Sequence, residues 1–231
     1  IHYTSEHVSV FPALINTLTM TGISLLIAAP LGIFAAIYLV EYAHQTNRFI
    51  KFVRITSETL AGIPSIVFGL FGYLLFVTTF KLGFSLLAGG LTLSVMILPL
   101  IMRTTEEALK AVPDSFREGS YGLGAGKLRT IFKIVLPAAI PGILAGIVLS
   151  IGRIVGETAA LIYTAGTVAQ IPASILGSGR TLSVHMFALW NEGLNPNESY
   201  ATAVLLLLLV ILLNFISRKM ANRLEKGKQH E

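Results

Sequence analysis

The chain has 231 residues, of which 54% are apolar and 13% are charged, and its mean hydropathy is +0.75. A soluble core of this size does not require so much apolar surface, so the composition excludes an ordinary soluble domain and indicates a polytopic membrane protein. Because the chain contains no cysteine, disulfides and thiolate metal sites are also excluded.

Stretches without Asp, Glu, Lys or Arg predict the membrane spans, since a helix needs about 20 apolar residues to cross the hydrocarbon core. They cover residues 7–40, 59–80, 82–102, 134–152 and 199–217. We therefore expect an all-α bundle with five visible transmembrane helices. The first stretch is too long for one straight span, so we place the span near Ile23–Val40, kinked at Pro30, after an outer lead-in.

Two other spans are expected to depart from a simple helix. The second begins near Ala61 and is interrupted by glycines and by Pro64, which membrane helices tolerate where neighbours satisfy the freed backbone groups. The fourth starts at Pro137 or Pro141, because proline suits the first turn of a helix. We extend this helix past its charged residues toward Tyr163.

The basic residues predict the orientation of the chain. Fourteen of the 17 Lys and Arg lie in the first connection, the third connection and the tail, which share one side of a five-span arrangement. By the positive-inside rule these segments are cytoplasmic, so the visible amino terminus is external and the carboxyl terminus is cytoplasmic. Because these residues are dispersed and lack interleaved aromatic side chains, we expect no nucleic-acid binding.

The longest outer connection runs from Gly166 to Tyr200, and its segment Leu182–Trp190 is expected to form an interfacial helix anchored by Trp190. The five histidines of the chain lie without ligand spacing, so we expect no metal site. No cluster of Ser, His and acidic residues suggests a catalytic triad, and we predict no catalytic residue.

A polar, basic island of twenty residues, Glu118–Pro137, separates two long apolar runs. Its small residues Gly119, Ser120 and Gly124 would leave a side-chain-poor face that another protein can approach closely. The island therefore predicts a docking surface, and the alternative is an ordinary basic loop at the lipid headgroups. The run GLGAGK within it is not a phosphate-binding loop, because only three residues separate Gly122 from Gly126 and Leu follows the Lys.

Arg153 and Glu157 interrupt the fourth apolar stretch in the run GRIVGETAALIYTAG. Four residues apart, they are expected on one helical face. Placing one charge deep in the bilayer, within a membrane span, costs at least about 2.5 kcal/mol of insertion free energy. These residues should therefore face a bundle interior, a partner or water. Two interpretations stay open: a mutual salt bridge, or an anion path in which Arg153 meets the anion and Glu157 orients it. We include the adjacent Thr158 in this path.

The island resembles the EAA loop of ABC-importer permeases in the spacing of Glu118, Gly119, Ser120 and Gly124, followed by Leu136-Pro137. Gly119 and Ser120 replace the two alanines of that motif but are equally small. The resemblance implies that a cytoplasmic loop over about residues 104–137 seats in a cleft of an ATPase subunit. It also implies a coupling role for these residues, which are Glu118, Gly119, Ser120, Gly124, Leu136 and Pro137.

The runs GRIVGETA and GIPSIVFGLFGY, with the closing TLSVHMFALW, resemble the permease subunits of bacterial phosphate-specific ABC importers, and favour the PstA type. The resemblance covers about Phe11 to Arg223. It implies a type I importer permease fold forming a single domain over residues 1–231. That fold has six spans, so we expect the first one to be missing here, in keeping with a start that lacks Met.

The resemblance further implies a multi-pass protein of the bacterial inner membrane that moves inorganic phosphate into the cytoplasm. Its implied partners are an ATP-binding subunit that carries ATP and Mg, a PstC-type permease and an external phosphate-binding protein. The chain itself would hold no cofactor and would not be an enzyme. Two alternatives remain: a permease for another oxyanion, such as sulfate or molybdate, and a membrane enzyme or sensor without a transport role.

Overall fold

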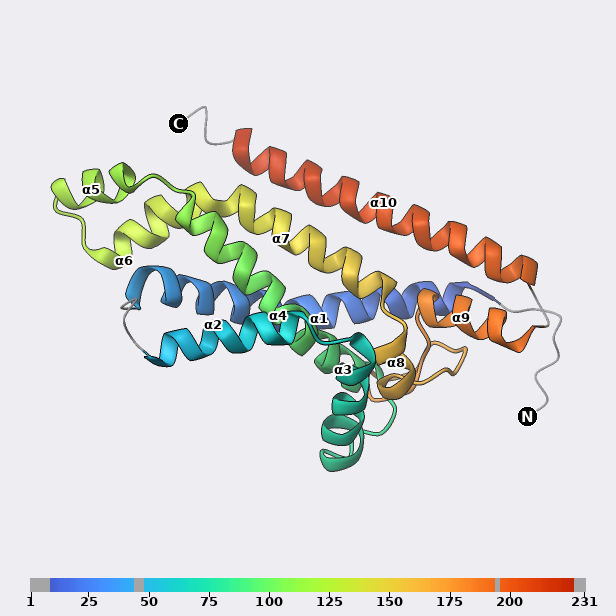
Figure 1. Cartoon of the computed structure of the whole chain (residues 1–231). Coiled ribbons are helices and arrows are strands. Elements are labelled where there is room, and N and C mark those ends of the chain that lie inside the picture. The colour runs from blue at the N-terminus through green and yellow to red at the C-terminus, as the bar shows by residue number, and fades with distance from the viewer. Residues whose placement is uncertain (1–8, 44–47, 194–195, 227–231) are drawn as a thin grey trace. The chain divides into compact units, whose positions relative to one another are not determined.

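The computed structural model describes residues 9–43, 48–193 and 196–226, and every element in these ranges is a helix (Figure 1). The all-α prediction is therefore confirmed. In chain order, with η for a π-helix, the elements are α1 (Phe11–Ile37), η1 (Tyr38–Tyr42), α2 (Arg48–Ala61), α3 (Ser65–Gly72), η2 (Tyr73–Thr79), α4 (Leu86–Lys110), α5 (Asp114–Gly122), α6 (Lys127–Thr130), η3 (Ile131–Val135), α7 (Leu136–Gly156), α8 (Ala159–Thr164), α9 (Leu182–Glu192) and α10 (Pro196–Lys226).

Four continuous helical segments of the described chain are long and apolar enough to cross a membrane. They are Phe11–Tyr42, Leu86–Lys110, Lys127–Gly156 and Pro196–Ile216. A fifth crossing is possible by length and composition if the pair Arg48–Ala61 and Ser65–Thr79, bent by 106°, counts as one span. With that pair the number equals the five spans predicted from the sequence.

The bend between α2 and α3 has its cause in Pro64. This residue has an extended backbone, with ψ of 143°, and precedes the first residue of α3. Proline lacks the N–H that would continue the hydrogen bonds of α2, so the helix ends and a new one begins. The predicted interruption is confirmed, although the helix before the break, α2, was not part of the predicted span.

The predicted outer lead-in before Ile23 is helical from Phe11 onward, so it and the predicted span form one continuous helix, α1. Its place outside the membrane stays a prediction. The helix accommodates three polar residues here because threonine hydroxyls donate hydrogen bonds to its own backbone. Thr17, Thr19 and Thr21 donate to the carbonyl oxygens four residues before them, at 2.7, 2.9 and 2.8 Å. Polar residues that satisfy themselves in this way do not interrupt a membrane helix.

The predicted extension of the fourth span toward Tyr163 is wrong. The helix that begins at Lys127 and continues through η3 into α7 ends at Gly156. Thr158 has a non-helical backbone, with φ of −122° and ψ of −54°, and it is the residue before α8. Arg153 and Glu157 therefore do not share one continuous helix.

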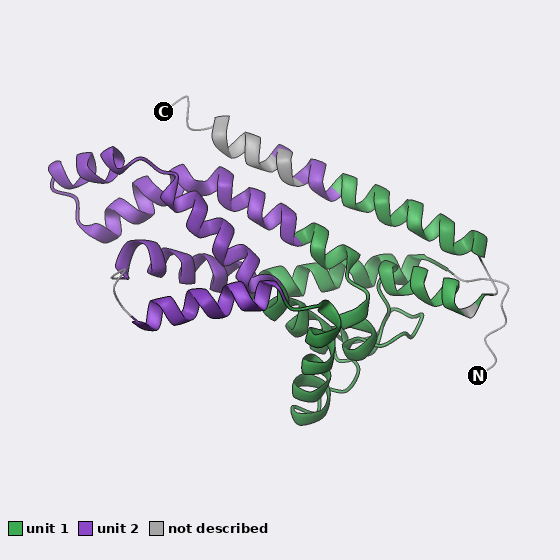
Figure 2. Ribbon diagram, viewed as in Figure 1, with its two compact units in different colours: residues 1–27, 63–96, 151–212 green, residues 28–62, 97–150, 213–231 purple. Residues whose placement is uncertain are grey.

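Contacts divide the chain into two compact units, which Figure 2 distinguishes by colour. Unit 1 contains residues 1–27, 63–96 and 151–212, and unit 2 contains residues 28–62, 97–150 and 213–231. Helices α1, α4, α7 and α10 contribute to both units. This division into units does not test the prediction of a single permease domain over residues 1–231, which stays a prediction.

Unit 1 depends on a close approach between α3 and α8. A methyl group built on Gly69 would lie 2.8 Å from the Cα of Ala160, so only glycine allows these two backbones to approach so closely. The connection between α8 and α9 is hydrogen-bonded to α1 through Asn16, whose amide donates to the carbonyl oxygens of Gln170 and Arg180 at 2.9 and 3.1 Å. Within unit 1, these two hydrogen bonds attach the non-helical connection between α8 and α9 to helix α1.

Unit 2 packs α7 against α4 through small residues. A methyl group on Gly142 would lie 2.6 Å from the Cβ of Ala108, and one on Gly146 would overlap the hydroxyl of Thr104. Glycines four residues apart allow membrane helices to pack closely in this way. The end of α4 continues into a buried apolar cluster that includes Leu109 and contributions from η1 and η3. This packing supports the base from which α5 and α6 project.

Candidate functional site

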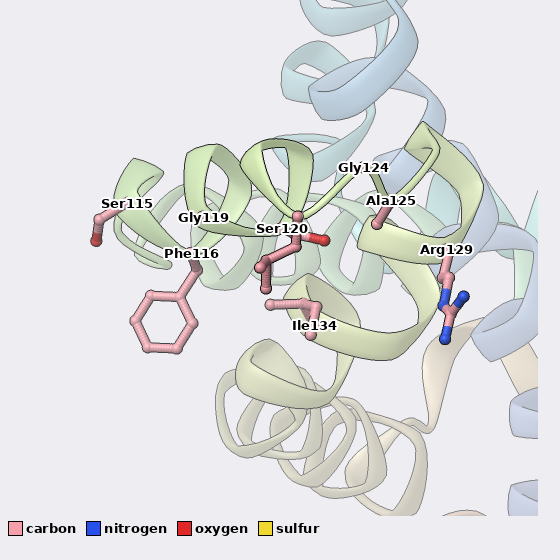
Figure 3. A pocket seen from close by; sticks show the side chains of 9 residues that line it. Ser115, Phe116, Gly119, Ser120, Gly124, Ala125, Arg129 and Ile134 are labelled. Carbon is pink, nitrogen blue, oxygen red and sulfur yellow. The ribbon is translucent and has the colours of Figure 1, made fainter.

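Helices α5 and α6 enclose an open hollow of about 650 Å³ in unit 2. We call it the α5–α6 hollow. Figure 3 shows Ser120 and Ile134 in its middle and Phe116 and Arg129 toward opposite sides. Its lining residues are Ser115, Phe116, Gly119, Ser120, Leu123, Gly124, Ala125, Arg129 and Ile134. The mixture of small and apolar residues, with Arg129 beside them, suits the approach of a protein surface.

Three of the six residues predicted to couple to an ATPase, Gly119, Ser120 and Gly124, line this hollow. Glu118 is exposed on the same helix, α5, but does not line the hollow. Leu136 and Pro137 form the start of α7 and also lie outside the lining. The structure thus brings the small residues of the motif together and leaves its acidic and terminal residues apart.

Gly124 has a structural role that the sequence interpretation did not include. Its φ of +81° lies in the left-handed region, where glycine is favoured. The N–H of Gly124 donates to Tyr121 O at 2.9 Å, and the N–H of Ala125 donates to Ser120 O at 3.1 Å. These two bonds form a Schellman motif, which ends α5 and turns the chain toward α6.

Side chains then fix α5 relative to α6 and to the rest of unit 2. The hydroxyl oxygens of Ser120 and Thr130 lie 2.8 Å apart and share a hydrogen bond. Arg117 binds Glu41 at 2.9 Å, although 76 residues separate the two in the chain. No local sequence pattern identifies a partner at such a separation, so Arg117 was predicted only as one of the basic residues on the cytoplasmic side.

Arg153 lies in the last turn of α7 and is only partly buried. Among the ion pairs of the described residues, none joins Arg153 to Glu157, so the salt-bridge interpretation has no support in the structure. A cation near the carboxyl end of a helix is instead stabilised by the helix dipole.

Glu157 lies between α7 and α8, two residues before the first residue of α8. Its carboxylate is buried, and Oε1 accepts a hydrogen bond from the N–H of Ala160 at 3.0 Å. The first N–H groups of a helix have no partner within it, and a carboxylate at this end also meets the positive end of the dipole. Glu157 is thus held by α8, and this places it beside the break that follows Arg153.

Helix α9 contacts the same break through Ser183, which sequence reasoning did not single out. The hydroxyl of Ser183 donates to the carbonyl oxygen of Gly156 at 3.1 Å and also bonds the hydroxyl of Thr158. Ser183 is buried, so these hydrogen bonds are shielded from water. Of the predicted anion-path residues, Glu157 and Thr158 therefore form a short non-helical turn that is hydrogen-bonded to α9, and Arg153 lies in the last turn of the helix before it.

Comparison with known proteins identifies the family. The family described as binding-protein-dependent transport system inner membrane component matches residues 28–230. The chain belongs to this family. It is therefore a multi-pass permease component of an inner-membrane transport system, and the alternative of a membrane enzyme or sensor is wrong.

Individual relatives agree with this assignment. This permease is 39% identical over 210 residues to the phosphate transport system permease protein PstA 1 of Mycobacterium tuberculosis, covering 89% of this chain and 68% of that protein. It is 38% identical over 220 residues to the phosphate transport system permease protein PstA of Yersinia pestis, covering 89% and 71%. The prediction of a resemblance to phosphate permeases of the PstA type is thus confirmed.

A solved structure of the MetNI methionine ABC transporter, in inward facing conformations, has a chain similar to this permease. The TM-score is 0.71 at 22% sequence identity, covering 93% of this chain and 94% of that chain. At this identity the likeness concerns the fold alone. It confirms the predicted importer-permease fold.

His185 in α9 is a buried titratable residue of this permease outside the segments able to span a membrane. Burial, and secondarily the positive charge of Arg180, lowers the pKa of His185 from its ordinary 6.5 to about 4. The imidazole is consequently neutral at physiological pH in the folded state. Neutrality allows it to pack in the interior without a carboxylate partner.

This depressed pKa predicts a loss of stability in acid. Between pH 6.5 and about pH 4 the unfolded chain binds a proton at His185 that the folded chain does not, so the free energy of unfolding falls as the pH falls. The whole loss amounts to about 3 kcal/mol. We expect the melting temperature of the purified protein to fall less steeply with acid in His185→Gln than in the wild type. Equal pH slopes for the two proteins would contradict this assignment.

Proposed function

We propose that this permease carries inorganic phosphate across the inner membrane into the cytoplasm, driven by ATP hydrolysis on a separate subunit. The observation that carries the proposal is Arg153, a partly buried cation at the end of a helix long enough to span the membrane. Its fixed, planar charge can bind an oxyanion through two parallel hydrogen bonds. The relatives named as phosphate transport permeases support phosphate as that oxyanion.

The α5–α6 hollow supports the second part of the proposal. Its lining has two glycines, two serines and an alanine, so a helix or loop of an ATP-binding subunit can approach the backbone closely. We assign Gly119, Ser120 and Gly124 to this contact, with Glu118 at its edge and Leu136-Pro137 at the start of the adjoining span. ATP and Mg would reside on that partner and not on this permease.

The complete transporter on this proposal contains three further kinds of protein. They are the ATP-binding subunit, a second permease of the PstC type, and an external binding protein that delivers phosphate. The family description supports the last of these, because it names a transport system that depends on a binding protein. The external protein would meet the side of the membrane opposite to the α5–α6 hollow.

Another oxyanion is the second candidate substrate, because Arg153 would bind sulfate or molybdate through the same charge. Uptake by cells distinguishes the candidates. We expect deletion of this permease to reduce uptake of radiolabelled phosphate, and a plasmid copy to restore it. Excess unlabelled phosphate should compete, whereas sulfate and molybdate should not. Loss of sulfate or molybdate uptake with unchanged phosphate uptake would contradict the proposed substrate.

The proposed orientation predicts opposite accessibility of two residues. The chain contains no cysteine, so Lys127→Cys at the start of α6 and Asn197→Cys at the start of α10 each introduce a single thiol. In intact spheroplasts, a membrane-impermeant maleimide should label position 197 and not position 127. Inside-out vesicles should give the reverse pattern. Labelling of position 127 from outside would show that the orientation is wrong.

A further inference from the structure

Arg117 uses every hydrogen-bond donor of its guanidinium. A guanidinium has five N–H groups, and here they reach four different acceptors. Two go to Glu41 Oε1, from Nε at 3.2 Å and from Nη2 at 2.9 Å. The others go to Leu109 O, Val112 O and Asp114 Oδ1, at 2.9, 2.9 and 3.1 Å. This saturated arrangement fixes both the position and the plane of the side chain.

These bonds join three elements of unit 2. Arg117 belongs to α5, and Glu41 belongs to η1, which continues the first span. The carbonyl oxygen of Leu109 belongs to the end of α4, and that of Val112 to the connection between α4 and α5. The side chains of Arg117 and Glu41 are only 14% and 6% exposed. A pair so well shielded is weakly screened by salt and holds its geometry better than a surface ion pair.

A second contact reaches the same short segment from the other arm of the hollow. The ammonium of Lys127, at the start of α6, lies 4.7 Å from the centre of the Tyr42 ring. This distance is within the range of a cation–π interaction. Both arms of the hollow therefore hold η1, through Glu41 and through its neighbour Tyr42.

Stability alone does not account for a shielded ion pair at this place. Burying two charges costs desolvation energy, and well-packed apolar residues stabilise a fold equally well. What the pair adds is a directional link between α5 and the first span. In addition, η1 is a π-helix, a local widening of the helix that is frequent at functional sites.

We propose that Glu41 and Arg117 form a positioning pair through which movement of α5 is transmitted to the first span. The inference rests on the proposed function, since it presumes that an ATP-binding subunit docks at the α5–α6 hollow and moves α5. Arg117 and Glu41 touch neither the anion nor ATP. They determine whether a displacement of α5 also displaces η1 and the helix that precedes it.

The test compares two isosteric substitutions on the two carboxylates that bind Arg117. Glu41→Gln removes the charge that joins α5 to η1. Asp114→Asn, the matched control, removes a carboxylate that lies within α5 itself and is 85% exposed. The complete transporter is purified with each variant and reconstituted in liposomes. Subunit content, ATP hydrolysis and phosphate uptake are measured on the same preparation.

We expect Glu41→Gln to retain its ATP-binding subunit and to hydrolyse ATP, while the phosphate transported per ATP falls about fivefold or more. Asp114→Asn should stay near the wild-type ratio. A merely structural role would lower the amount of assembled complex and leave this ratio unchanged, and that result would overturn the proposal. A wild-type complex that does not transport phosphate would instead contradict the proposed function.

A covalent cross-link between residues 41 and 117 provides a second test if the transporter with Glu41→Gln fails to assemble. The double variant Glu41→Cys with Arg117→Cys can be joined by a short bis-methanethiosulfonate, which forms a disulfide with each thiolate as methanesulfinate leaves. The chain has no other thiol. We expect the cross-link to raise the phosphate transported per ATP above that of the same variant before cross-linking. The opposite result would be a loss of transport on cross-linking that is reversed when the linker is cleaved by reduction. That result would overturn the proposal that a maintained link between residues 41 and 117 transmits the movement of α5.

Discussion

Arg153→Gln is expected to abolish phosphate uptake without preventing assembly of the transporter. The guanidinium has no ion pair with Glu157, and it occupies the last turn of α7, where the helix dipole contributes only about 0.3–1 kcal/mol. Removing the charge therefore costs the fold little. Hydrogen bonds between a charged group and an anion are each worth about 1.5–3 kcal/mol, so uptake should fall about 100-fold.

Three further variants make this experiment decisive. Arg153→Lys keeps the charge but loses the planar pair of donors, so it should restore little uptake. Glu157→Gln retains an oxygen that can accept from Ala160 N–H, so it should preserve the start of α8. The double variant Arg153→Gln with Glu157→Gln should stay inactive. If its uptake returns to near the wild-type level, with membrane abundance checked by blot, the two residues form only a structural pair.

Gly119→Leu is expected to prevent the ATP-binding subunit from docking while leaving the permease folded. Nothing lies within 4 Å of a methyl group built on Gly119, so the new side chain has room within this chain. It would project from α5 beside the hollow, where the docked partner has to approach the backbone. Replacing a helical glycine also favours α5 by about 0.5–1 kcal/mol, so lost docking cannot result from unfolding.

Gly122→Leu is the matched control for this substitution. Gly122 lies on the same helix, is exposed and likewise has no atom within 4 Å of an added methyl group, but it does not line the hollow. Co-purification with an affinity-tagged ATP-binding subunit measures docking. We expect Gly119→Leu to reduce it at least about tenfold, since a steric block costs more than one lost contact. Equal recovery of both variants would remove the docking assignment.

Gly124 is a less suitable position for the same experiment. Because its φ is +81°, any other L residue strains the turn that ends α5. A defect in a Gly124 variant would therefore combine altered loop geometry with altered docking. The sequence predicted only that a glycine here allows a close approach, because the positive φ of Gly124 is a property of the folded backbone.

The apolar stretches predicted most of the helical organisation, because hydropathy follows directly from residue type. Pro64 also predicted the interruption of the second span, since proline cannot continue the hydrogen bonds of a helix. The continuity of α1 through the predicted lead-in was not predicted, because threonine hydroxyls can bond to the backbone of their own helix, and this is not visible in a hydropathy pattern.

The sequence predicted which residues belong to the candidate sites, but not how those residues are arranged in space. Glycine and glutamate at residues 156 and 157 do not by themselves indicate where α7 ends, and the end depends on the backbone of Thr158 and on the bond from Ala160 to Glu157. Arg117 was missed for another reason. Its partner Glu41 is distant in the chain, and only the folded structure brings the two together.

Uptake by the reconstituted transporter tests the central claim most directly. The permease is purified with its ATP-binding subunit and its second permease, placed in liposomes that enclose ATP and Mg, and given the external binding protein with radiolabelled phosphate outside. The account predicts phosphate accumulation that requires ATP and the binding protein and that is lost with Arg153→Gln. Accumulation that is equal without ATP, or that persists in the Arg153→Gln complex, would contradict it.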